Sequence, residues 1–136
     1  MRLGSMILLG SREFELINLL RFHFHSLAHD NCAVLAAVDD VTVILNDRHA
    51  SRTPSASVLI GSQAVPKFNL STPDQVQILM ALFRVDWKNV DLVVTFNVPI
   101  LTSDGDRMTQ KEVADARADF DAFVRDLEII DYGLFQ

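Results

Sequence analysis

Residues 75–99, QVQILMALFRVDWKNVDLVVTFNVP, decide the fold of this chain, because they read as two strands joined by a short loop at residues 86–90. Apolar residues alternate along the first strand, as in a strand with one face in a core. Its other face begins polar and becomes apolar, so we expect the second half to be covered on both sides. The second strand alternates more regularly, and we expect its pairing to stop at Pro99, which has no N–H to donate. The alternating sets of the first strand are Val76, Ile78, Met80 and Leu82 on one face and Leu79, Ala81, Phe83 and Val85 on the other.

Two amphipathic segments flank this region. Residues 14–29 carry apolar side chains at helical spacing, and the first turn holds Glu13 and Glu15, of the sign that a helix dipole favours there. Residues 109–112, TQKE, form a capping box, in which the hydroxyl of Thr109 and the carboxylate of Glu112 satisfy two backbone donors. An apolar stripe continues from this box to residue 127. Both segments are therefore predicted to be helices.

Three further strands are predicted before the central pair. Residues 32–38, 41–45 and 57–65 are rich in β-branched residues, and residues 39–40 between the first two form either a tight turn or an exposed bend. Residues 129–135, IIDYGLF, are too apolar to hang free, so we expect them to pack back against the sheet. Short connections between neighbouring strands favour antiparallel pairing. The sequence therefore predicts an α+β fold, an antiparallel β-sheet with helices packed on both faces.

The composition limits the class of protein. The chain has 136 residues, of which 49% are hydrophobic, and we expect one domain over residues 1–136, with residues 1–10 unassigned. The net charge is −6, and the last 36 residues carry nine acidic and four basic side chains, which argues against nucleic acid and leaves room for a basic protein partner. No apolar run approaches the ~20 residues of a membrane-spanning helix, and the run in residues 1–9 is too short for a signal-peptide core. We therefore expect no membrane insertion, and a location in the cytosol or nucleus.

Candidate chemistry is sparse. His25 and His29 stand four residues apart and share a helix face, as zinc ligands do, but no third ligand stands at a suitable spacing, so ordinary surface histidines are expected. Cys32 is either a nucleophile or, as we expect, a core residue at the start of a strand. Trp87 in the loop is either an exposed contact or a packed residue, and we favour the packed one. The glycines form no nucleophile elbow, phosphate loop or dinucleotide motif. We expect a binding module that is not an enzyme and holds no metal or cofactor.

Several stretches resemble, in chain order, the Mog family of Ran guanine nucleotide release factors. The segments ALFRV and VDLVVTFNVP of residues 81–99 are similar to the family pattern ALFRL followed by TDLLITFNDP. The other similar stretches are FHFHSLAHDNCA at residues 22–33, GSQAVPKFN at 61–69, FDAFVRDL at 120–127 and DYGLFQ at 131–136. The resemblance implies the Mog/PsbP-like fold, an α/β/α sandwich.

The resemblance also implies a function. Members of this family bind the small GTPase Ran, promote release of its guanine nucleotide and support nuclear protein import, in nucleus and cytoplasm, without catalytic chemistry of their own. Acidic residues near the start of the family's first helix contact Ran. Glu15 stands in that position here, and Glu13 and Asp30 are the other candidates for the contact. Glu13 is equally explained as a first-turn charge, and Asp30 as a helix stop. We expect a monomer.

The start of the chain departs from the family. Residues 1–10 match neither the opening strand LFGGA nor the turn PDNQEVF, and Leu9 and Gly10 stand where an aspartate usually precedes Ser11. We therefore expect a divergent or N-terminally truncated member without the opening strands. The alternative is a non-catalytic structural or adaptor module of the same fold, PsbP-like or acting in channel trafficking, that does not bind Ran.

Overall fold

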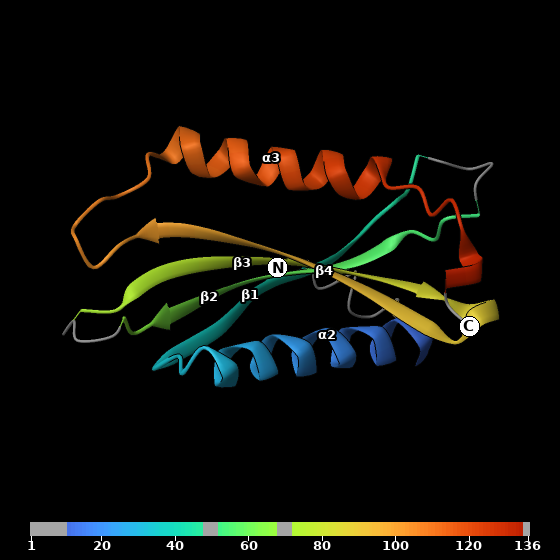
Figure 1. The fold of residues 1–136 in the computed structure, drawn as a ribbon, viewed down its shortest axis with the longest axis horizontal. Helices are drawn as coiled ribbons and strands as arrows, with labels where there is room; N and C mark the ends of the chain where they lie inside the picture. Colours follow the sequence, from blue (N-terminus) through green and yellow to red (C-terminus); the bar gives the residue numbers. More distant parts are fainter. Residues whose placement is uncertain (1–10, 48–51, 68–71, 135–136) are drawn as a thin grey trace.

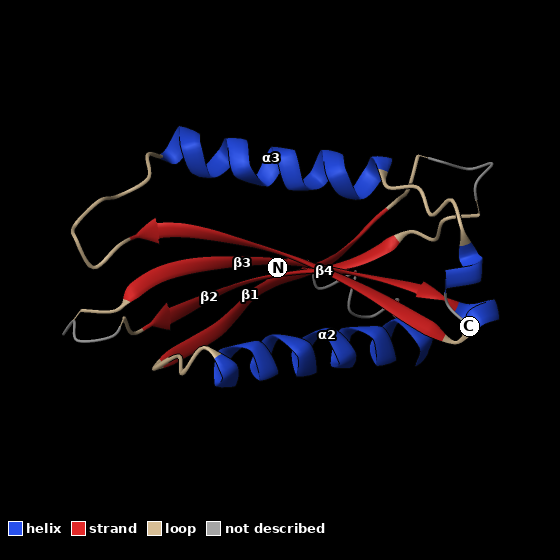
Figure 2. Cartoon of the chain, in the orientation of Figure 1, coloured by secondary structure: helices blue, strands red, loops and turns tan. Residues whose placement is uncertain are grey.

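The described part of the chain forms a four-stranded antiparallel sheet with one helix on each face (Figure 1; Figure 2). The computed structural model describes residues 11–47, 52–67 and 72–134. The elements are α2 (Ser11–Asp30), β1 (Leu35–Ile44), β2 (Ala56–Val65), β3 (Asp74–Val85), the 3-10 helix η2 (Asp86–Lys88), β4 (Val90–Leu101), α3 (Gln110–Asp126) and the 3-10 helix η3 (Tyr132–Leu134). The strands follow one another in the order β1-β2-β3-β4, and each pairs antiparallel with the next. The predicted α+β class is confirmed, while the expectation about residues 1–10 lies outside the described residues.

Strand β3 carries both hydrophobic cores, because its two alternating faces are each covered by a helix. On the side of α2, its side chains meet those of that helix and of the neighbouring strands. On the side of α3, the opposite set meets the helix residues Phe120 and Val124. The β3 residues that belong to these two cores are Ile78, Met80 and Leu82 under α2, and Leu79, Ala81 and Phe83 under α3. The expectation that both faces of this strand are covered is confirmed.

The capping box at the start of α3 is confirmed. The Thr109 hydroxyl accepts a hydrogen bond from the backbone N–H of Glu112 at 3.1 Å. The Glu112 carboxylate accepts one from the backbone N–H of Thr109 at 2.8 Å. A cap of this kind stabilises a helix by about 1 kcal/mol.

Strand β1 runs without a break through residues 39–40. Of the two alternatives for these residues, a tight turn or an exposed bend, the structure therefore has the bend. The pairing with β2 shifts between Val38 and Asp40, which leaves Asp39 as the extra residue of a β-bulge. The hydroxyl of Ser62 donates to the Asp39 carboxylate at 2.8 Å and so fixes the bulge to β2.

Cys32 is not a core residue at a strand start, because β1 begins only at Leu35. Cys32 is exposed, and its φ of 56° lies in the left-handed region. Its backbone N–H donates to the carbonyl oxygen of His29 at 3.0 Å, which places it in the turn that ends α2. The prediction failed because an apolar run, residues 33–38, follows this turn directly.

The pairing of β4 with β3 does not stop at Pro99. Pro99 lies opposite Val76, and Leu101 pairs with Gln75 beyond a register shift. Among the strands that the structure describes, β4 lies at the edge of the sheet and has a neighbour on one side only. A proline is tolerated in such a strand and beside a bulge.

The segment after α3 folds back, but onto a loop and an aromatic side chain rather than onto the sheet. The backbone N–H of Ile129 donates to the Thr53 hydroxyl at 3.0 Å, and the ring of Tyr132 lies 5.0 Å from that of Trp87. Ile130 remains 90% exposed, so the expectation that this segment packs against the sheet is wrong at that residue.

Candidate functional site

The three acidic residues predicted to contact a partner lie at the two ends of α2. Glu13 and Glu15 lie in its first turns, and Asp30 is its last residue. A helix of 20 residues is roughly 30 Å long, so Asp30 is remote from the other two. Glu13 is half-buried, whereas the side chain of Glu15 is 63% exposed. The structure therefore brings Glu13 and Glu15 to one region and leaves Asp30 at the other end.

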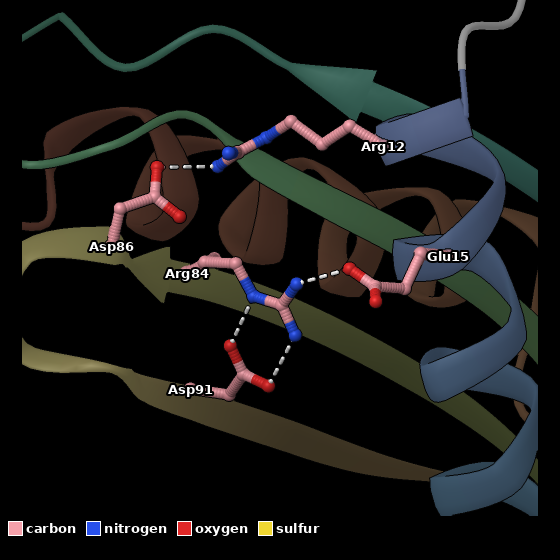
Figure 3. A network of polar contacts seen from close by, with 5 residues as sticks. All are labelled: Arg12, Glu15, Arg84, Asp86 and Asp91. Atoms are coloured by element: carbon pink, nitrogen blue, oxygen red, sulfur yellow. Dashed lines mark hydrogen bonds and ion pairs between the residues drawn. The ribbon is translucent and has the colours of Figure 1, made fainter.

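Arg84 connects Glu15 to the hairpin of β3 and β4 (Figure 3). Its Nε donates to Oδ1 of Asp91 at 2.8 Å, and its Nη2 donates to Oδ2 at 3.0 Å. Its remaining nitrogen, Nη1, donates to Oε1 of Glu15 at 2.5 Å. One guanidinium thus holds two carboxylates, and the bond to Asp91 has the bidentate geometry in which arginine pairs most strongly.

The strand register explains why these side chains meet. Arg84 stands between the buried residues Phe83 and Val85, so alternation directs it to the face of the sheet that carries α2. Asp91 is its partner across the β3–β4 ladder, which places both side chains on the same face. The first turns of α2 lie at this end of the hairpin (Figure 3).

Both members of the hairpin pair are held in their charged forms. The hydrogen bonds from Arg84 lower the pKa of Asp91 below its ordinary value of 3.8, against the opposing effect of burial. The charges of His23 and Arg12 act in the same direction with smaller effect. The bond to Asp91, with a smaller contribution from Glu15, raises the pKa of Arg84.

A second ion pair joins the start of α2 to the turn of the hairpin. Arg12 Nη2 lies 2.8 Å from Oδ2 of Asp86, and both side chains are about half exposed. An exposed pair of this kind contributes little stability by itself. We call the set Arg12, Glu15, Arg84, Asp86 and Asp91 the α2–hairpin corner. Its three carboxylates outnumber its two arginines.

Trp87 lies beside the corner and is both packed and exposed. Its ring packs against Tyr132 at 5.0 Å and lies 4.3 Å from the guanidinium carbon of Arg52, while 44% of the residue remains exposed. Trp, Tyr and Arg are the residues most often found at the energetic centres of protein interfaces. The two alternatives stated for Trp87 therefore do not exclude one another.

The histidines considered as zinc ligands are on the surface. His25 and His29 are exposed, and His29 lies 3.8 Å from Asp30, its neighbour in sequence. Within residues 11–47, 52–67 and 72–134, no three histidine, cysteine, aspartate or glutamate side chains gather as metal ligands do. None of the helices in that part of the chain is long and apolar enough to span a membrane.

The sequence did not identify Arg84 and Asp91 as part of the site. A signal was present, because an arginine stands inside an otherwise apolar strand and an aspartate stands at the mirror position across the turn. The strand register that places Arg84 opposite Asp91 is known only from the structure. The contact of Glu15 with Arg84 of β3 depends in turn on where α2 crosses the sheet.

Comparison with known proteins now identifies the family. A family model described as "Ran-interacting Mog1 protein" matches residues 10–99. The chain is 27% identical over 122 residues to the Ran guanine nucleotide release factor of Danio rerio, covering 85% of this chain and 67% of that protein. It is 27% identical over 140 residues to the probable ran guanine nucleotide release factor of Dictyostelium discoideum, covering 87% of this chain and 67% of that protein. No solved structure is significantly similar to the chain. The resemblance seen in the sequence is confirmed, and the chain belongs to the family of Ran-interacting Mog1 proteins.

Proposed function

We propose that this protein binds the small GTPase Ran, promotes release of its guanine nucleotide and thereby supports nuclear protein import, acting in the nucleus and the cytoplasm. One observation carries the proposal. The family match over residues 10–99 contains every residue of the α2–hairpin corner, and the relatives that match are named as Ran guanine nucleotide release factors. This overlap between the family match and the candidate site supports the proposal.

Nucleotide release of this kind needs binding and no catalytic group on the release factor. If the factor binds the nucleotide-free GTPase more tightly than the loaded form, it lowers the affinity for nucleotide by the same factor. The size of the effect is limited by that difference in affinity. A surface with complementary charge and shape is sufficient, and we propose a binding role rather than an enzymatic one.

The contact residues that we propose are Glu13 and Glu15. The exposed carboxylate of Glu15 is suited to pair with a basic side chain of the partner, and Glu13, which is half-buried, lies in the same turns of α2. The net charge of −6 accelerates association with a basic surface. Asp30 belongs to the same proposal only as a separate contact, since the length of α2 separates it from the corner.

The test measures release of a fluorescent guanine nucleotide from Ran as the protein is added, together with retention of Ran in its GDP, GTP and nucleotide-free forms. We expect faster release and the strongest retention of the nucleotide-free form. Replacing Glu15 by lysine should weaken binding at least tenfold, because a repulsive charge replaces an attractive one. The matched control is Lys111→Glu on α3, which reverses a charge on the opposite face and should leave release unchanged.

Two results would contradict the proposal in different ways. If none of the three forms of Ran were retained, the proposed partner would be wrong. If Glu15→Lys bound Ran as tightly as the unaltered protein, with the same far-UV spectrum, Ran would remain the partner but Glu15 would not be one of its contact residues.

A further inference from the structure

We propose that Arg84, clamped by Asp91, is a positioning residue that orients the Glu15 carboxylate so that its second oxygen receives a lysine or arginine side chain of the partner. The inference rests on the proposed function, because it assigns a role to Arg84 within the same binding site. It adds to that function a structural element that neither the predicted contacts nor the relatives' names assign.

The geometry divides the Glu15 carboxylate into two halves. Oε1 accepts the hydrogen bond from Nη1 of Arg84 at 2.5 Å. Oε2 lies on the side of the carboxylate away from the guanidinium (Figure 3), and it accepts no hydrogen bond from the residues that the structure describes. The Glu15 side chain is 63% exposed, so a partner can reach this oxygen. One carboxylate can therefore serve Arg84 and a partner cation at the same time.

The clamp makes this orientation firm. A glutamate in the first turns of a helix has several rotamers, and fixing one of them costs conformational entropy when a partner binds. Arg84 is only 22% exposed and is held by two bonds to Asp91, which is 25% exposed. Its third nitrogen is therefore presented from a fixed position, and Glu15 is oriented before any partner arrives.

The same arrangement explains why Asp91 is not itself the contact. Both of its oxygens are engaged by Arg84, and it is much less exposed than Glu15. A partner cation that took Asp91 would have to break a bidentate pair and leave a partly buried guanidinium with one bond. Glu15 can accept a new cation without that cost.

The experiment is a double-mutant cycle in the nucleotide-release assay with Ran, reading the half-saturating concentration of this protein and the release rate at saturation. Glu15→Gln should raise the half-saturating concentration about tenfold, the effect expected when a moderate hot spot of a protein interface is lost. Arg84→Lys keeps the charge but loses the planar guanidinium that binds two carboxylates. It should raise the half-saturating concentration about fivefold, because Glu15 is then free to adopt other rotamers. The double variant should be no more than about twofold weaker than Glu15→Gln alone, because Arg84 acts through Glu15. The release rate at saturation should stay unchanged in all three.

The matched control is Arg125→Lys, the same exchange in the Arg125–Asp121 pair of 2.7 Å on α3, across the sheet from the corner. It should leave the half-saturating concentration unchanged. A second variant, Asp91→Glu, keeps the charge and displaces the clamp, and it should behave like Arg84→Lys. The Nε–H signal of Arg84 in a proton–nitrogen NMR spectrum reports the clamp without a partner, and we expect slow exchange with water that both clamp variants accelerate.

Three outcomes would overturn the inference. Additive losses, giving about a fiftyfold weaker double variant, would mean that Arg84 contributes independently of Glu15. Tighter binding by Arg84→Lys would mean that Arg84 competes with the partner for Glu15. Failure of the unaltered protein to bind Ran would remove the proposed function and this inference together, whereas the first two outcomes leave that function intact.

Discussion

Gly61 of β2 lies directly against the ring of Phe24 of α2. A Cβ added to Gly61 would be 2.5 Å from Cε1 of Phe24 and 2.9 Å from the carbonyl oxygen of Ala37, a backbone atom that cannot rotate away. Both Gly61 and Phe24 are buried. The absence of a side chain at Gly61 is therefore what allows α2 to approach the sheet closely enough to place Glu15 at the corner.

We predict that Gly61→Ala lowers the free energy of unfolding by about 1–3 kcal/mol, the usual cost of overpacking a core. Urea denaturation followed by far-UV circular dichroism measures it. Adding Phe24→Leu should recover part of the loss, because the smaller side chain removes the ring that the new methyl meets. If Gly61→Ala unfolded at the same urea concentration as the unaltered protein, α2 would not be seated on β2 as described.

Asn46, just after β1, holds the end of α3. Its Nδ2 donates to the carbonyl oxygens of Val124 and Leu127, at 3.3 and 2.9 Å, and the residue is 5% exposed. Asn46→Asp replaces this donor by an acceptor that faces two carbonyls, so we predict a loss of about 1–3 kcal/mol in the free energy of unfolding. Asn97→Asp is the matched control on the exposed part of β4, and it should change stability by less than about 0.5 kcal/mol. Equal effects of the two substitutions would contradict the capping role of Asn46.

The sequence predicted the sheet and its two helices because the alternation of residues 76–85 and the stripe after Thr109 are strong periodic signals. It misplaced Cys32 because a left-handed turn residue and the first residue of a strand look alike in sequence when an apolar run follows. The corner depends on contacts between residues far apart in the chain, such as Glu15 and Arg84. Register and helix position decide such contacts, and neither follows from local pattern. The assignment of Glu13, Glu15 and Asp30 as contacts remains a prediction.

The free energy of unfolding should fall at acid pH, because protonation removes the interactions of carboxylates whose pKa is lowered in the folded protein. The pKa of Asp91 is lowered mainly by hydrogen bonds from Arg84, and that of Asp74 mainly by the backbone N–H of Ser103. A group whose pKa is lower in the folded state stabilises the fold above its unfolded-state pKa, near the ordinary value of 3.8, and this contribution is lost as the pH falls through the folded-state pKa. We predict that the free energy of unfolding declines below about pH 4 and that Asp91→Asn makes this decline shallower. Urea unfolding at a series of pH values between 2 and 6 measures both. Identical slopes in the two proteins would show that Asp91 is not held by Arg84.

Trp87 is the one tryptophan of the chain and reports on the corner through its fluorescence. The ring of Tyr132 lies 5.0 Å from it, so Tyr132→Ala removes a cover from an indole that is already 44% exposed. We predict that the emission maximum moves to longer wavelength, because the indole gains contact with water, while the far-UV spectrum stays unchanged. Tyr132→Phe is the control, since it keeps the ring and should keep the emission maximum. An unshifted maximum in Tyr132→Ala would show that the segment after α3 does not cover Trp87 in solution.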